Sequence, residues 1–131
     1  GTGHSVGHFS NVHEPPFSIN QHNTTPVLES YITSIEPGYY LENAYGIRIE
    51  NLVYTALASK KGYLRFEPLT LCPIDLNLIK PELLTESEKS WLNQYHQKVF
   101  ETLQPLLNKQ ERLWLKSKCR LPRKDFTWRN K

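Results

Sequence analysis

The spacing of the hydrophobic residues changes once along the chain, near Pro81, and this change limits the fold class more than any other feature. Before Pro81, apolar and polar residues alternate, as in the stretch GIRIE at residues 46–50. A two-residue period of this kind is typical of strands, whereas spacings of three and four residues after Pro81 indicate an amphipathic helix. The residues of this helical stripe are Trp91, Leu92, Tyr95, Val99 and Leu103. We therefore expect antiparallel strands followed by helices, an α+β arrangement.

Turn and capping residues divide the chain into the elements that we expect. Pro37–Gly38 predicts a turn that ends the first strand, and Thr85 with Glu88 has the pattern of a capping box. Pro105 predicts a break or kink in the helix that follows, because proline cannot donate a backbone hydrogen bond. The expected elements are a loop at residues 14–26, strands at 27–35, 46–58 and 63–71, and two helical stretches, one after Thr85 and one at 106–118.

The composition fits a soluble globular chain with one modest core. The chain has 131 residues and a hydrophobic fraction of 38%, and it holds no apolar run of about eighteen residues, so we expect no membrane span. No signal peptide is visible. Cys72 lies in the apolar run LTLCPI and is expected to be a buried thiol, which favours a reducing, cytoplasmic compartment. Met is absent, so we expect a processed or excised segment, although simple removal of an initiator Met remains open.

Positive charge gathers at the C-terminal end. Residues 109–131 hold nine Lys and Arg residues against two acidic residues, a net charge of +7, while the whole chain carries +3. Basic residues interleaved with Trp114, Phe126 and Trp128 are able to meet a phosphate backbone. A solvated helix with a loose terminus is the commoner meaning of such a pattern, and we expect no nucleic-acid partner.

Two carboxylates lie where a charge is costly. Glu50 follows Ile47 and Ile49 on a predicted strand, and Glu36 ends another strand. A buried charge needs a partner or a metal ion, and two carboxylates with an imidazole form a ligand set suited to Zn, Mn, Co or Fe. Glu36 as a solvated strand end, and Glu50 paired with an arginine, are equally open at this point. The spacing of the histidines decides little: His4 and His13 fit a ligand pair or a turn, and His8, His22 and His96 are expected to be structural or surface residues.

Five motifs change this balance through a resemblance to a known family. They are GTGHSVG, NVHE, IEPGYY, GIRIEN and FEPLTLCPI, in that order. Together they resemble the C-terminal part of the catalytic domain of Xaa-Pro aminopeptidases, also called aminopeptidase P, of the three-domain type in metallopeptidase family M24. The similarity runs from Gly1 to about Ile79. It implies a pita-bread fold, with residues 1–84 as the C-terminal half of the catalytic domain and residues 85–131 as a helical extension with a basic tail.

The resemblance also implies a site with two divalent metal ions, most commonly manganese, with zinc or cobalt as alternatives. By position, His4, Glu36 and Glu50 match metal ligands of the family, and Glu50 matches the one that bridges both ions. His13 matches a catalytic histidine that contacts the substrate, and Glu36 is also expected to take a proton from the attacking water. The side chains that match groups orienting these carboxylates are Arg48 and Tyr40. The implied reaction removes the first residue from peptides with proline in second position.

Two aspartate ligands of the family belong to a strand pair upstream of the GTGH motif, and neither Asp75 nor Asp125 lies in a matching motif. We therefore expect the 131 residues to be part of a longer enzyme, inactive alone, with the upstream part and a second copy of the enzyme as partners. Two alternatives stay open. One is a prolidase-type dipeptidase; the other is a non-catalytic binding module on the same fold.

Overall fold

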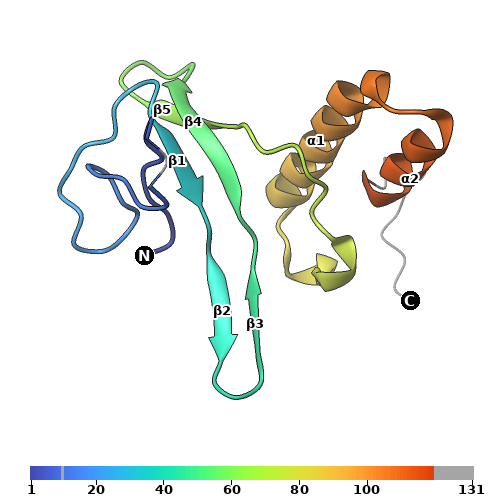
Figure 1. Ribbon diagram of the computed structural model, residues 1–131, viewed down its shortest axis with the longest axis horizontal. Helices are drawn as coiled ribbons and strands as arrows, with labels where there is room; N and C mark the ends of the chain where they lie inside the picture. The colour runs from blue at the N-terminus through green and yellow to red at the C-terminus, as the bar shows by residue number, and fades with distance from the viewer. Residues whose placement is uncertain (10, 120–131) are drawn as a thin grey trace. The chain divides into compact units, whose positions relative to one another are not determined.

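The computed structural model describes residues 1–9 and 11–119 and divides the chain into two compact units, Gly1–Thr70 and Leu71–Lys131. Figure 1 shows the strands in the first unit and the helices in the second. The strands are β1 (Ile32–Ile35), β2 (Gly38–Leu41), β3 (Tyr45–Arg48), β4 (Asn51–Leu57) and β5 (Leu64–Pro68). The helices are α1 (Glu86–Leu103), α2 (Lys109–Cys119) and three short 3₁₀ helices, η1 (Leu76–Leu78), η2 (Pro81–Leu83) and η3 (Gln104–Leu106).

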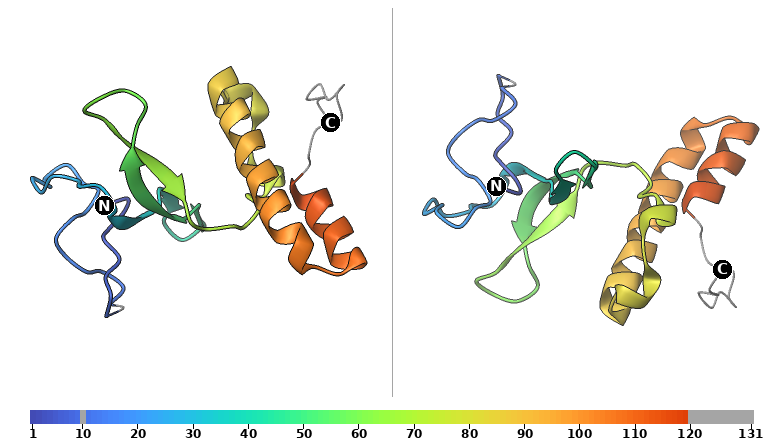
Figure 2. Two further views of the ribbon diagram at one scale, coloured as in Figure 1. Left: turned by 90° about the horizontal axis from the view of Figure 1, so that it is seen from above. Right: turned by 90° about the horizontal axis from the view of Figure 1, so that it is seen from below.

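The first unit is built on an antiparallel sheet with the strand order β1-β4-β5. The segment at residues 2–6 adds to the free edge of β1, because Ser34 N–H donates to His4 O at 2.8 Å and Val6 N–H donates to Ile32 O at 3.0 Å. Residues 17–19 then pair with the outer side of this segment, where Ile19 N–H donates to Gly3 O at 2.8 Å. The N-terminal residues are thus held between two other segments rather than left at an edge, and Figure 2 shows them beside β1.

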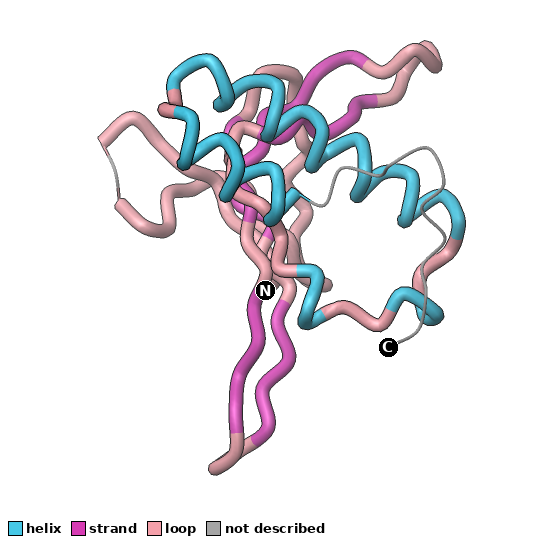
Figure 3. Tube along the Cα trace, turned by 90° about the vertical axis from the view of Figure 1, so that its right-hand side faces the viewer, coloured by secondary structure: helices cyan, strands magenta, loops and turns pink. Residues whose placement is uncertain are grey.

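Strands β2 and β3 continue the β1–β4 pair as a two-stranded ribbon (Figure 3). Ile35 pairs with Asn51 and Gly38 pairs with Arg48, so one register runs through both pairs. The ribbon turns at residues 42–44, where Asn43 adopts a left-handed backbone with φ 57°. Asparagine tolerates this conformation better than most residues.

The second unit is a helical hairpin. Helix α1 begins with the predicted capping box: Thr85 Oγ1 accepts from Glu88 N–H, and the Glu88 side chain accepts from Thr85 N–H. η3 separates α1 from α2 at the predicted break, and the two helices lie side by side in Figures 1 and 2. The core cluster at their interface consists of Tyr95, Val99, Leu115 and Cys119, with Leu71, Ile74, Phe100, Leu103 and Leu107 packed against it.

The predicted order of strands and then helices is observed, with four corrections. The single strand predicted at 46–58 is divided into β3 and β4, which belong to different sheets. The chain does not turn at Pro37–Gly38; it passes into β2, and the turn comes later, because Pro37 O accepts from Ile49 N–H at 3.3 Å and keeps the ribbon paired. β1 begins at Ile32, not at residue 27. Cys72 is exposed rather than buried, and its neighbours Leu71 and Ile74 pack against the helical core instead.

The second unit begins at Leu71, and its segment before residue 85 carries η1 and η2. The domain boundary expected at residue 85 stays a prediction. The predicted basic residues beyond Cys119, with Phe126 and Trp128, lie outside the described residues. Within residues 1–9 and 11–119, no helix has both the length and the apolar character needed to cross a membrane.

Candidate metal centre

His4 lies in the N-terminal segment that pairs with β1. Thr33 Oγ1 donates to His4 O at 2.7 Å, and His4 N–H donates to Ser34 Oγ at 3.0 Å, so hydrogen bonds hold the His4 backbone on both sides. Gly3, just before it, allows this close approach. A Cβ atom at Gly3 would collide with the Ser34 carbonyl oxygen and lie 2.7 Å from Ile19 Cδ1. Gly3 is therefore required for His4 to pair closely with β1.

The orientation of the His4 ring is fixed by its two nitrogens. Nδ1 lies 3.0 Å from Ser5 O, and because a carbonyl can only accept, Nδ1 carries the proton of this bond. Nε2 lies 3.0 Å from Glu36 Oε1. In the neutral ring, the lone pair of Nε2 therefore faces a carboxylate oxygen. Both atoms are acceptors, so this contact needs a cation or a further proton between them.

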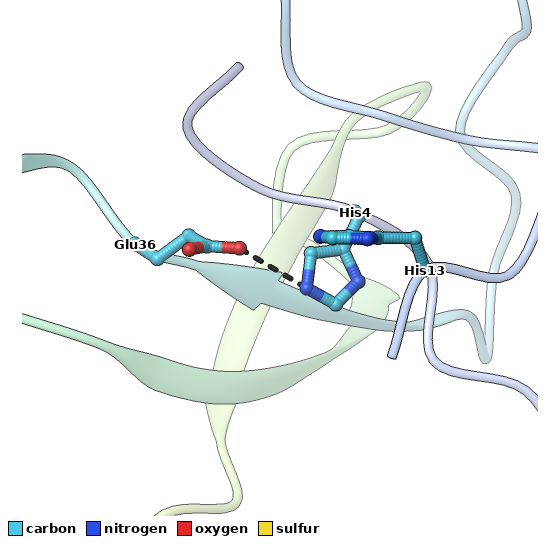
Figure 4. Close-up of side chains that lie close together, drawn as sticks. All are labelled: His4, His13 and Glu36. Atoms are coloured by element: carbon cyan, nitrogen blue, oxygen red, sulfur yellow. Dashed lines mark ion pairs between the residues drawn. The ribbon is translucent and has the colours of Figure 1, made fainter. Parts of the chain in front are cut away.

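His13 completes a cluster with His4 and Glu36. The two imidazole rings are 4.5 Å apart between centroids, in an edge-to-face arrangement. One ligand atom from each of the three side chains lies within 4.8 Å of the others. Figure 4 shows the rings of both histidines beside one another, with the Glu36 carboxylate directed at His4. The side chains of His4 and Glu36 are 14% and 19% exposed, whereas His13 is exposed.

Glu50 faces Glu36 across the ribbon. Since Ile35 pairs with Asn51 and Gly38 with Arg48, the same register places Glu36 opposite Glu50. Side chains that are directly opposite in antiparallel strands lie on one face, with their Cβ atoms about 5 Å apart. The Glu50 carboxylate is nevertheless outside the cluster of His4, His13 and Glu36, and its side chain is 43% exposed.

Arg48 joins the two carboxylates from the same face. Its Nη1 lies 3.9 Å from Glu36 Oε2, and its Nε lies 3.7 Å from Glu50 Oε2. Nη1 also donates to the Tyr40 hydroxyl at 3.4 Å. The hydrogen bond to Tyr40 is the main cause that raises the pKa of Arg48, and the charges of Glu36 and Glu50 act in the same direction. Arg48 thus places a permanent positive charge beside both carboxylates.

The donor set fits a divalent cation. An imidazole nitrogen and carboxylate oxygens suit Mn²⁺, Zn²⁺ or Co²⁺, and the cluster has no thiolate. Two neighbouring ligands of an octahedral ion, each about 2.1 Å from it, lie about 3 Å apart. The 3.0 Å between His4 Nε2 and Glu36 Oε1 agrees with that spacing. A cation between His4 Nε2 and Glu36 Oε1 would also give both acceptor atoms a partner.

The other histidines stay away from the cluster. His8 stacks edge-to-face on Phe9 with 5.1 Å between ring centroids, and exposed His22 donates its backbone N–H to Asn20. His96 is buried between backbone groups of the helical unit.

The sequence interpretation missed Ser34, whose hydroxyl lies 3.2 Å from Glu36 Oε1. Its signal was the two-residue spacing from Glu36, which puts both side chains on one face of a strand.

Comparison with known proteins assigns both regions of the chain. Residues 1–56 match metallopeptidase family M24, and residues 62–121 match the C-terminal region of peptidase M24. A probable Xaa-Pro aminopeptidase P from Coprinopsis cinerea is 48% identical over 127 residues, which is 88% of this chain and 20% of the relative. Aminopeptidase P2 from Arabidopsis thaliana is 45% identical over 125 residues, or 87% of this chain and 18% of the relative.

A solved structure shares the fold. The X-prolyl aminopeptidase of Caenorhabditis elegans, described as a cytosolic enzyme with a di-nuclear active site, superposes with a TM-score of 0.78 and 43% sequence identity. The match covers 91% of this chain and 21% of that one. The predicted fold class, the C-terminal half of an α+β pita-bread fold, is thereby confirmed. The chain spans about a fifth of the length of the relatives it matches.

Proposed function

Because the chain belongs to metallopeptidase family M24, we propose that its 131 residues form part of the active site of an Xaa-Pro aminopeptidase, which removes the first residue from peptides with proline second. The observation that carries this proposal is the cluster of His4, His13 and Glu36, with Glu50 opposite Glu36 in the ribbon. The names of the relatives support the substrate class.

In this proposal His4, Glu36 and Glu50 hold divalent cations, with Mn²⁺ as the first choice and Zn²⁺ or Co²⁺ as alternatives. When bound, such ions act as Lewis acids that polarise the scissile carbonyl and favour deprotonation of the attacking water. Arg48 and Tyr40 keep the two carboxylates in place through the contacts between Arg48 and each partner. The di-nuclear site of the C. elegans enzyme supports a pair of ions.

The proton chemistry falls to Glu36 and His13. Glu36 accepts a proton from the attacking water, since a carboxylate that lies beside the reacting group is suited to act as a general base. His13 is exposed, with its ring beside that of His4, so it is free to contact the substrate. It donates a hydrogen bond to the oxyanion or to the leaving nitrogen as the peptide bond breaks.

The three ligands of this chain are too few for the bridged pair of ions that the family uses. We propose that two aspartates from an upstream part of the same protein complete the set, and that the isolated chain binds one cation weakly and is inactive. The complete enzyme is expected to form a homodimer and to work in the cytoplasm, as the description of the C. elegans enzyme as cytosolic supports.

A metal titration of the 131-residue chain tests the proposal. Electron paramagnetic resonance of free Mn²⁺ should report binding to the wild-type chain, and both His4→Ala and Glu36→Gln should weaken binding by at least about tenfold, because each removes one ligand. His22→Ala, in an exposed loop away from the cluster, serves as the matched control. Binding that neither substitution weakens would contradict the assignment.

A peptide assay of the same chain tests the claim that it lacks ligands. A Gly-Pro-type tripeptide incubated with the isolated chain and Mn²⁺ should stay intact over a time in which a complete family member digests it. Release of glycine by the isolated chain would show that three ligands suffice and would remove the need for upstream aspartates.

A further inference from the structure

We propose that Ser34 is a positioning residue for the metal centre, because its hydroxyl ties the Glu36 carboxylate to the His4 backbone. This inference rests on the proposed function, since it concerns the same two ligands. Ser34 lies in the middle of β1 with none of its surface exposed. A buried hydroxyl has to find its partners within the protein, and both of its partners belong to ligand residues.

The donor and acceptor roles of the hydroxyl follow from its neighbours. His4 N–H donates to Ser34 Oγ at 3.0 Å, so Oγ acts as an acceptor there. The hydroxyl proton then has two acceptors in range, Glu36 Oε1 at 3.2 Å and His4 O at 3.5 Å. His4 O already accepts from Ser34 N–H at 2.8 Å and from Thr33 Oγ1 at 2.7 Å. Because both lone pairs of that carbonyl are in use, the proton goes to Glu36.

The bond fixes the one oxygen that the cluster depends on. Glu36 Oε1, which accepts from Ser34, is also the oxygen 3.0 Å from His4 Nε2. The backbone of His4 and the carboxylate of Glu36 thus share one hydroxyl, and the distance between the two ligands is set by a single buried side chain.

Arg48 contacts the other oxygen of the same carboxylate, so the Ser34 hydroxyl decides where Oε1 lies. Arg48 Nη1 lies 3.9 Å from the other oxygen of Glu36, Oε2, and the Arg48 side chain is 52% exposed. In Ser34→Ala, the hydroxyl that holds Oε1 on the His4 side is lost, while the attraction of the guanidinium for Oε2 remains. The carboxylate would then turn towards the guanidinium, and its Oε1 would leave the position opposite Nε2.

The test is the affinity of the chain for Mn²⁺ in three variants. Ser34→Ala should raise the dissociation constant about tenfold or more, which is the usual cost of losing a group that orients a ligand. Ser34→Thr keeps the hydroxyl and should bind Mn²⁺ much more tightly than Ser34→Ala, because the orienting group is retained. Thr55→Val removes an equally buried hydroxyl from β4, whose hydrogen bonds are to Tyr31 and Leu28, and should leave the affinity unchanged.

Circular dichroism and a thermal unfolding curve for each variant establish that it is folded. The proposal is overturned if folded Ser34→Ala binds Mn²⁺ like the wild type, or if Thr55→Val weakens binding as much. This failure differs from a failure of the proposed function. If only the role of Ser34 is wrong, His4→Ala and Glu36→Gln still weaken Mn²⁺ binding. If the proposed function is wrong, these two substitutions leave Mn²⁺ binding unchanged.

Discussion

His4 and His96 are the same residue type in opposite surroundings. The His4 ring has Ser5 O on one nitrogen and a carboxylate oxygen on the other, and in the neutral ring the second contact needs a cation or a further proton. The His96 ring is 1% exposed; its Nδ1 lies 3.2 Å from Cys119 O and its Nε2 accepts from Ile74 N–H at 3.0 Å. Both nitrogens of His96 are used by backbone groups in the neutral form, so we assign this residue to the structure of the helical unit.

The surroundings of His96 predict an acid-sensitive helical unit. Burial is the main cause that lowers the pKa of His96 below its ordinary value, although the contact between Nδ1 and Cys119 O acts in the opposite direction. A lowered pKa means that the unfolded chain binds the proton more tightly, so stability is complete above the unfolded pKa of about 6.5 and falls as the pH drops below it. Urea unfolding followed by helical circular dichroism at pH 7.5 and pH 5.5 checks this. In His96→Gln, the free energy of unfolding should fall less between pH 7.5 and pH 5.5, because the imidazole is gone. A fall equal to that of the wild type would contradict the assignment.

The motifs identified the charged members of the site, but not the residue between them. His4, His13 and Glu36 belong to motifs that resemble a family, so they were predicted by position. Ser34 could not be predicted in this way, because a serine in a strand has no fixed partner until the register is known. Only the pairing of residues 2–6 with β1 brings its hydroxyl to both His4 and Glu36.

At the level of secondary structure, the ribbon of β1–β4 and β2–β3 is the element that assembles the site. A single register carries Glu36 opposite Glu50 and places Arg48 on the same face. Proline followed by glycine usually marks a turn, and this is why the sequence predicted the chain reversal at Pro37–Gly38. The strand continues instead because Pro37 needs no acceptor for its own nitrogen and its carbonyl pairs with Ile49.

The capping box of α1 is the local element that the sequence predicted fully. Thr85→Ala should lower the free energy of unfolding of the helical unit by about 1 kcal/mol, because it removes the acceptor for an N-terminal backbone N–H. Thr85→Ser retains this acceptor and serves as the control. Chemical denaturation monitored by circular dichroism measures the difference, and equal stability of the Ala and Ser variants would contradict the role of the cap.

The capping box also predicts a lowered pKa for the Glu88 carboxyl. The hydrogen bond from the Thr85 backbone, followed by the one from its side chain, lowers the pKa of Glu88. A lowered carboxyl pKa contributes stability above the unfolded value of about 4.3, and this contribution is lost as the pH falls through the folded pKa. NMR titration of the Glu88 carboxyl should show the depressed pKa in the wild type and a smaller depression in Thr85→Ala. Equal Glu88 pKa values in the two proteins would contradict the prediction.

Across the whole molecule, the two faces of the β2–β3 ribbon differ. Glu36, Tyr40 and Arg48 lie on the face of the metal centre, and the opposite face is apolar and exposed. Its residues are Tyr39, Leu41, Tyr45, Ile47 and Ile49. Soluble proteins seldom leave an apolar patch of this kind uncovered. Since the relatives are about five times as long as the matching part, we expect an upstream part of the enzyme to cover this face.

The isolated chain should therefore self-associate. Sedimentation velocity over a range of concentrations is expected to show dimers or larger species, because these apolar side chains are exposed in the described part of the chain. Ile47→Lys places a charge in the centre of the face and should shift the chain towards monomer. Ala44→Lys adds the same charge at the exposed turn of the ribbon and should not. A wild-type chain that stays monomeric at all concentrations would contradict this expectation.

The most direct test of the whole account is a graft. In the Coprinopsis cinerea relative, the 127 residues that align with this chain are replaced by the residues of this chain, and release of the first residue from a Gly-Pro-type tripeptide is measured with Mn²⁺. We predict an active chimera, a loss of about 100-fold or more in kcat for Glu36→Gln within the graft, and no loss for Glu42→Gln at the exposed turn. A folded chimera without activity, or one that keeps full activity after Glu36→Gln, would contradict the assignment of these residues to the metal centre of an Xaa-Pro aminopeptidase.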